Sequence, residues 1–169
     1  LGDAPIGRRP APAPCSAPPQ ISVLIGHRGT ERLPLLLATL ESLAAQEEVS
    51  LECLVIEQDT TPRISASLPT WVRHIHAPLS EPEAPYNRSH TFNVGAREAR
   101  SPVLLLHDND MLVPRGYARR ILQRIGNGYA VVNPKRFIFY LNPQHSQAVL
   151  KHAAPYDEKP AEYIVQNLE

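Results

Sequence analysis

The sequence has few cysteines, no long apolar run and no excess of charge. Its two cysteines, Cys15 and Cys53, are too few for a disulfide framework and show no metal-ligand spacing. We therefore expect a reducing, cytoplasmic location. No apolar stretch is long enough to span a bilayer, so attachment to a membrane would be peripheral. Lysine plus arginine (17) equals aspartate plus glutamate (17), which argues against a general nucleic-acid-binding protein.

The 169 residues do contain enough apolar residues, 43%, to bury a core. Residues 1–20 include the run APAPCSAPP and show no apolar period, so we expect a proline-rich linker or tail there. Residues 21–169 are expected to form one folded unit. The chain begins with leucine, and we expect it to be part of a longer protein.

Strand-like and helix-like segments alternate from Ile21 onward. Helical spacing or capping signals predict helices after Thr30, which is a candidate N-cap, over 88–100 and from Pro114 to Ile125. Apolar runs predict strands at 21–26, 51–57, 71–77, 101–107, 129–134 and 136–141. This alternation predicts an α/β fold with a mostly parallel sheet covered by helices on both faces.

Polar residues follow three of the predicted strands at the point where each strand ends. They are His27-Arg28, Glu57-Gln58-Asp59 and Asp108-Asn109-Asp110. Ligands of parallel α/β sheets bind beyond the carboxyl ends of the strands, so we expect these clusters to meet at one site.

The run LLLHDND carries the most specific signal, because an apolar strand brings Asp108 and Asp110 to the rim of the sheet. Oxygen-only ligands suit Mg²⁺ or Mn²⁺, and such an ion could bridge a diphosphate. The alternative is an acidic turn in which Asp108 or Asp110 caps the next helix. A phosphatase with an aspartyl nucleophile is set aside, because its motif usually follows the first strand and continues to threonine, whereas Met111 and Leu112 follow here.

The segment YNRSHTFNVGAREA begins a predicted helix that Asn87 could cap. Arg88 in the first turn would then project toward the ligand edge, where a guanidinium group and the helix N-terminus both favour phosphate. Tyr86 could stack on a base or pack against the loop. The alternative leaves Arg88 in solvent or paired with Glu81 or Glu83.

The segment Gly26-His27-Arg28-Gly29 offers backbone flexibility and a second arginine, but it matches neither a Walker loop nor the GxGxxG dinucleotide motif. Glu57 could accept the imide N–H of a uracil ring, or it could be an exposed acid at the end of a strand.

Three histidines complete the candidates. His74 and His76 would share one strand face, but without a third ligand nearby a metal pair is the weaker interpretation. We expect His107 to pack or to orient Asp108 rather than to take part in chemistry.

The runs ISVLIGHRG, LECLVIEQD and FNVGAREARSPVLLLHDND resemble, in this order, the family-2 glycosyltransferases, which are inverting enzymes with the GT-A fold. YNRSHTFNVGAREA with HDNDMLVP is also similar to the beta-1,4-galactosyltransferases, whose pattern is FNRAKLLNVGF followed by D-V-D-L-x-P. The resemblance covers residues 21 to about 141. It implies metal-dependent transfer of a sugar from a nucleotide-sugar, chiefly a UDP-sugar, to an acceptor hydroxyl.

The resemblance also implies roles for particular residues. Asp110 takes the place of the aspartate that binds Mn²⁺ or Mg²⁺, with Asp108 beside it. The nucleotide-sugar would lie against His27, Arg28, Glu57, Tyr86, Arg88, Asp108 and Asn109.

Two departures from the family pattern stand out. Gly26 replaces the usual proline after the first strand. The acidic general base is expected beyond residue 169, because neither Glu158 nor Glu162 is a convincing substitute, so the fragment alone should have little or no activity. A non-catalytic scaffold remains an alternative. A sugar nucleotidyltransferase is a weaker one, because IGHRGTER lacks the GxGxR loop of those enzymes.

Overall fold

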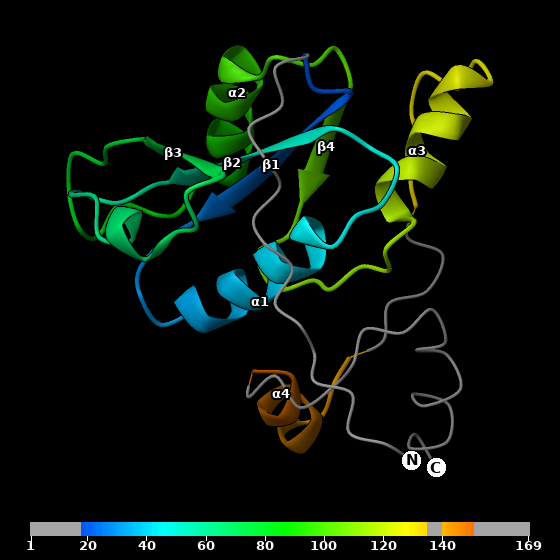
Figure 1. The fold of residues 1–169 in the computed structure, drawn as a ribbon. Helices are drawn as coiled ribbons and strands as arrows, with labels where there is room; N and C mark the ends of the chain where they lie inside the picture. The colour runs from blue at the N-terminus through cyan, green and yellow to red at the C-terminus, as the bar shows by residue number, and fades with distance from the viewer. Residues whose placement is uncertain (1–17, 135–139, 151–169) are drawn as a thin grey trace.

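A four-stranded parallel sheet forms the centre of the fold (Figure 1). The structure, a computed structural model, describes residues 18–134 and 140–150. The strands are β1 (Ile21–His27), β2 (Leu51–Glu57), β3 (Val72–His76) and β4 (Leu104–His107), in the order β3-β2-β1-β4. The predicted α/β fold with a parallel sheet is confirmed.

The register brings the carboxyl ends of β1, β2 and β4 close to one level. His27 at the end of β1 lies opposite Glu57 at the end of β2, and Ile25 lies opposite His107 at the end of β4. The polar residues that follow these strands therefore emerge at one edge of the sheet, as the sequence predicted.

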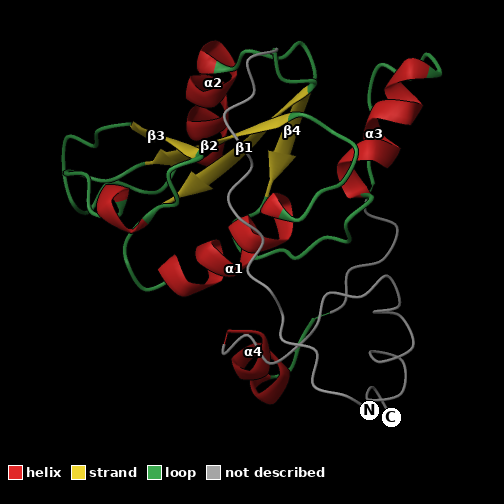
Figure 2. Cartoon of the chain, viewed as in Figure 1, coloured by secondary structure: helices red, strands yellow, loops and turns green. Residues whose placement is uncertain are grey.

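The helices are α1 (Leu33–Ala44), α2 (Arg88–Glu98), α3 (Tyr117–Gly126) and α4 (Pro143–Leu150), with a single 3-10 turn, η1 (Ser65–Ser67). Figure 2 shows α2 on one face of the sheet and α1 on the other. The side chains of β1 alternate between these two faces. Because a helix covers each face, both sets of side chains are buried, and the apolar run of β1 is therefore continuous.

Two apolar cores result from this alternation. On one face Val23 and Ile25 of β1 pack with Leu40 of α1 and Ile121 of α3. On the other face Leu24, Leu54 and Ile56 pack with Phe92 of α2. Burying each of these aliphatic side chains contributes about 1.5–3 kcal/mol, so the two cores hold α1 and α2 firmly against the sheet.

Gly95 allows α2 to approach the sheet closely. A Cβ atom at this position would lie 2.7 Å from Cδ1 of Ile56 and 3.3 Å from Cδ2 of Leu24. The close approach matters for function, because the N-terminus of α2 reaches the polar edge of the sheet.

Two local predictions were wrong. Thr30 does not cap α1: its carbonyl oxygen accepts the Leu33 amide at 3.1 Å in a turn, and Arg32 takes the N-cap position without a side-chain bond. Residues 129–134 do not form a strand. Tyr129 and Val131 are 56% and 84% exposed, so among the described residues this apolar pattern meets neither a partner strand nor a core.

Several expectations fall outside the described residues, namely the proline-rich segment over 1–17, the centre of the strand expected at 136–141, and the acids Glu158 and Glu162. Within the described part of the chain, no helix has the length and apolar character needed to cross a membrane.

Candidate functional site

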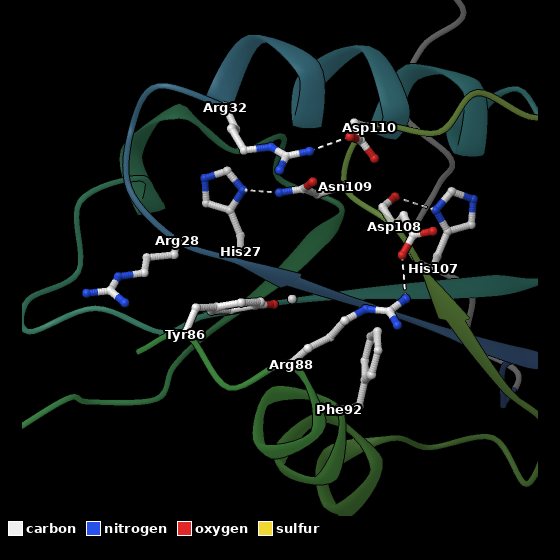
Figure 3. A pocket seen from close by; sticks show the side chains of 11 residues that line it. His27, Arg28, Arg32, Tyr86, Arg88, Phe92, His107, Asp108, Asn109 and Asp110 are labelled. Carbon is white, nitrogen blue, oxygen red and sulfur yellow. Dashed lines mark hydrogen bonds and ion pairs between the residues drawn. The ribbon is translucent and has the colours of Figure 1, made fainter. Parts of the chain in front are cut away.

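A pocket of about 340 Å³ opens at the carboxyl ends of β1 and β4, beside the N-terminus of α2 (Figure 3). It brings together every predicted site residue except Glu57. Its lining residues are Gly26, His27, Arg28, Arg32, Tyr86, Arg88, Phe92, His107, Asp108, Asn109 and Asp110.

The start of α2 is fixed by two amide side chains. Asn87 is the N-cap, as predicted, and its Oδ1 accepts the His90 amide at 2.9 Å. The Oε1 atom of Gln58 accepts the Asn87 amide at 2.6 Å, and the Gln58 amide donates to the His27 carbonyl at 2.9 Å. Gln58 thus ties the beginning of α2 to the ends of β1 and β2 and places Arg88 at the pocket.

Two ion pairs join opposite sides of the pocket. Arg88 pairs with Asp108, and Arg32 pairs with Asp110. The guanidinium carbon of Arg88 also lies 4.8 Å from the ring centroid of Phe92, an arrangement that orients the side chain. The alternative pairing of Arg88 with Glu81 or Glu83 is therefore wrong.

Arg28 holds the loop that leads to α2. Its guanidinium group donates to the carbonyl oxygens of Pro82 at 2.5 Å and of Ala84 at 2.6 Å. The loop continues to Tyr86, whose hydroxyl group lies 3.4 Å from Oγ1 of Thr91. Arg28 lines the pocket, but two of its donors are already used to fix the loop.

His27 lies beside Asn109 in the pocket wall (Figure 3). The imidazole is 1% exposed, with Nε2 2.8 Å from the Gly29 carbonyl oxygen and Nδ1 3.1 Å from Nδ2 of Asn109. Burial is the main reason that the pKa of His27 is lowered from 6.5. The ring is therefore neutral near pH 7.

His107 contacts the main chain of the acidic motif. Its Nδ1 donates to the main-chain oxygen of Asp108 at 2.7 Å, and its ring meets Tyr117 edge to face with centroids 6.0 Å apart. This agrees with the expected packing and orienting role. The next helix, α3, has Gly116 as its N-cap, so neither Asp108 nor Asp110 serves as a helix cap there.

The sequence matches a known protein family. Residues 30–167 match the family model described as Glycosyl transferase family 2. The chain belongs to this family. Among curated proteins, none matches the chain.

Two solved structures share the fold of this glycosyltransferase chain. They are described as the crystal structures of S. aureus TarS 1-349 and of S. aureus TarS, with 17% and 15% sequence identity and a TM-score of 0.50 each. They cover 64% and 71% of this chain, which spans 32% and 24% of the TarS chains. At this identity the likeness supports the GT-A fold alone, and the chain spans about a third or less of either structure.

Glu57 of this glycosyltransferase lies apart from the pocket. Its carboxylate is fully buried, where Oε1 accepts the Arg63 amide at 2.8 Å and Oε2 lies 2.7 Å from Nε2 of His74. His76 instead donates to the Asp59 carbonyl at 2.8 Å. The two histidines thus have separate partners, and both oxygens of Glu57 are used within the protein.

The pocket residues that could hold a divalent ion carry oxygen ligands. No group of three or more histidine, cysteine, aspartate or glutamate side chains suitable for a metal occurs in residues 18–134 and 140–150. Asp108, Asn109 and Asp110 instead provide two carboxylates and one amide. An ion such as Mg²⁺ accepts few protein ligands when phosphate and water fill its other positions. The residues fit an ion that binds together with a diphosphate.

Sequence reasoning missed Arg32, and it placed Gln58 at the ligand edge without its role in fixing the start of α2. Arg32 lies 78 positions from Asp110 in the chain, and Gln58 lies 29 positions from Asn87. Only the parallel order of the strands brings these residues to the same edge.

Proposed function

We propose that the pocket binds a nucleotide-sugar, a UDP-sugar, together with a divalent ion, and that the protein transfers the sugar to an acceptor hydroxyl with inversion. The observation that carries this proposal is the meeting of acidic and basic side chains in one pocket. Asp108, Asn109 and Asp110 form an oxygen-rich wall, and two arginines flank it, Arg32 from the start of α1 and Arg88 from the start of α2.

The arginines of the pocket suit a diphosphate. Arg88 is the first residue of α2, so its guanidinium group and the N-terminal amides of the helix would attract the same phosphate oxygens. The fork of a guanidinium group matches two phosphate oxygens at once. The ion pair with Asp108 and the contact with Phe92 orient the Arg88 side chain at this edge.

The oxygen-rich wall suits a cation and hydroxyl groups. Asp110 and Asp108 would hold Mn²⁺ or Mg²⁺, and such an ion, when bound, neutralises charge that develops on a diphosphate leaving group. Asn109 would lie beside the ligand hydroxyl groups. Neither aspartate is proposed as the general base, because both would be ligands of the ion. We expect the base on a carboxylate outside the described residues.

Calorimetric titration of UDP with Mn²⁺ and with EDTA tests the proposal on the full chain, with Asp110→Asn as the variant. Glu98→Gln is the matched control, because Glu98 is also an exposed carboxylate in an ion pair, with Arg73 at 3.6 Å. We expect metal-dependent binding by the wild type and by the control, and its loss in Asp110→Asn. Binding that survives EDTA, or that persists in Asp110→Asn, would contradict the metal site.

A further inference from the structure

The hydrogen bonds of His27 define which of its ring nitrogens carries the proton. Nε2 lies 2.8 Å from the carbonyl oxygen of Gly29, and a carbonyl oxygen only accepts hydrogen bonds. Nε2 must therefore carry the proton. In the neutral ring Nδ1 is then an acceptor, and it lies 3.1 Å from Nδ2 of Asn109.

This tautomer also defines the orientation of the Asn109 side chain. An acceptor at Nδ1 of His27 requires the amino group of Asn109 to face it, so Oδ1 faces away from His27. Asp108 and Asp110 each pair with an arginine, whereas His27 is the partner of Asn109 among the described residues. Asn109 thus contributes an uncharged side-chain oxygen between two carboxylates that are paired with arginines.

We infer that His27 is a positioning residue, which turns Oδ1 of Asn109 into the pocket so that it accepts a hydrogen bond from a hydroxyl group of the bound donor. The inference rests on the proposed function and deepens it. The sequence predicted direct contact between His27 and the nucleotide-sugar. Because the ring is 1% exposed and bonded through both nitrogens, we infer instead that it acts through Asn109.

A double-mutant cycle tests whether the two residues act as a unit. His27→Phe keeps the size of the ring and removes both nitrogens, and Asn109→Ala removes the acceptor. With Mn²⁺ present, each single variant should bind the donor about threefold to tenfold more weakly, the value of one hydrogen bond. The double variant should bind no more weakly than the weaker single variant, because both changes remove the same contact. If the affinity losses of the two single variants multiplied in the double variant, the inference would be overturned.

His76→Phe is the matched control. Its Nε2 lies 2.8 Å from a main-chain carbonyl, as that of His27 does, but His76 does not line the pocket. Binding should be unchanged in this variant. Titrations with UDP and with UDP-glucose distinguish the source of the hydroxyl group. If the effects of His27→Phe and Asn109→Ala are already coupled when UDP is the ligand, the hydroxyl group belongs to the ribose. If they are coupled only when UDP-glucose is the ligand, it belongs to the sugar.

Nitrogen NMR of the full chain supplies a readout that needs no ligand. The imidazole signals should show Nδ1 of His27 without a proton and Nε2 with one. The side-chain amide protons of Asn109 should exchange slowly, and His27→Phe should abolish this protection while His76→Phe leaves it intact. A protonated Nδ1, or protection that survives His27→Phe, would overturn the inference. If the wild type binds neither UDP nor UDP-glucose, the proposed function fails, and these signals still decide whether His27 positions Asn109.

Discussion

Gly26 is the position at which one added methyl group should disturb both the fold and the pocket. A Cβ atom there would overlap the hydroxyl group of Tyr86 and would lie 2.5 Å from Oγ1 and 3.3 Å from Cβ of Thr91. Thr91 is fully buried in α2, and its hydroxyl donates to the Arg88 carbonyl at 2.8 Å. Tyr86 is 38% exposed. In Gly26→Ala we therefore expect Tyr86 to move into solvent and the first turn of α2 to shift.

Two magnitudes follow for Gly26→Ala. Overpacking of this kind costs about 1–3 kcal/mol in the free energy of unfolding. In a chain of this size each kcal/mol lowers Tm by about 2–4 °C. If Tyr86 stacks on the base of the nucleotide, its displacement removes about 1–3 kcal/mol of binding free energy, which is about fivefold or more in affinity for UDP.

Urea denaturation followed by circular dichroism gives the stability, and titration of UDP with Mn²⁺ gives the affinity. Gly126→Ala is the control, because a Cβ atom at the end of α3 would meet nothing within 4 Å. That variant should be as stable as the wild type or more stable by up to about 1 kcal/mol, with unchanged affinity. If Gly26→Ala behaved like this control in both measurements, the close packing of β1, Tyr86 and α2 would be refuted.

Three shorter predictions concern stability and reactivity. Asn87→Ala should lower the free energy of unfolding by about 1 kcal/mol in urea denaturation, because it removes the cap of α2; no change would mean that the cap is not used. Burial lowers the pKa of His27 from its ordinary 6.5, so the unfolded chain binds a proton more readily, and stability should fall as the pH is lowered through about 6.5. His27→Phe should lessen that fall, and an equal fall in both proteins would contradict the neutral ring. Burial raises the pKa of the Cys53 thiol, so in Cys15→Ser a disulfide reagent should modify Cys53 only as fast as the protein unfolds.

The sequence was informative wherever a local pattern meets a general rule of topology. Apolar runs located the four strands of the sheet, and the rule that ligands bind at strand carboxyl ends predicted that Arg88 and Asp110 share one pocket. Asn87 was recognisable as a cap because its side chain acts within its own turn.

What the sequence did not show has one physical cause: the surroundings of these residues depend on partners distant in the chain. Glu57 looked like an acid at a ligand edge, but His74 on the neighbouring strand and the Arg63 amide take up its carboxylate. Arg32 looked like an ordinary residue at the start of a helix until the fold placed Asp110 beside it. Residues 129–134 had a strand-like composition, and composition cannot show whether a neighbouring strand is available.

The charge arrangement of the pocket predicts that metal and nucleotide bind cooperatively. UDP alone would satisfy Arg88 and Arg32 but would release Asp108 and Asp110 next to its own phosphate oxygens. A divalent ion alone would satisfy the aspartates but would lie beside two displaced arginines. Each ligand therefore removes the repulsion that the other meets. We expect each to tighten the other's binding by the same factor, about 5–150-fold, because coupling between two sites is reciprocal.

Paired titrations measure this factor from both sides. The affinity for UDP is determined with and without saturating Mn²⁺, and the affinity for Mn²⁺, followed by its electron paramagnetic resonance signal, with and without saturating UDP. In Arg32→Gln the factor should decrease, because Mn²⁺ no longer has to displace an arginine from Asp110 and binds more readily on its own. Arg119→Gln is the matched control, since its ion pair with Glu48 lies outside the pocket. Affinities for UDP and Mn²⁺ that do not depend on one another would show that the arginines and the aspartates do not bind one shared complex, and the pocket would then need a different occupant.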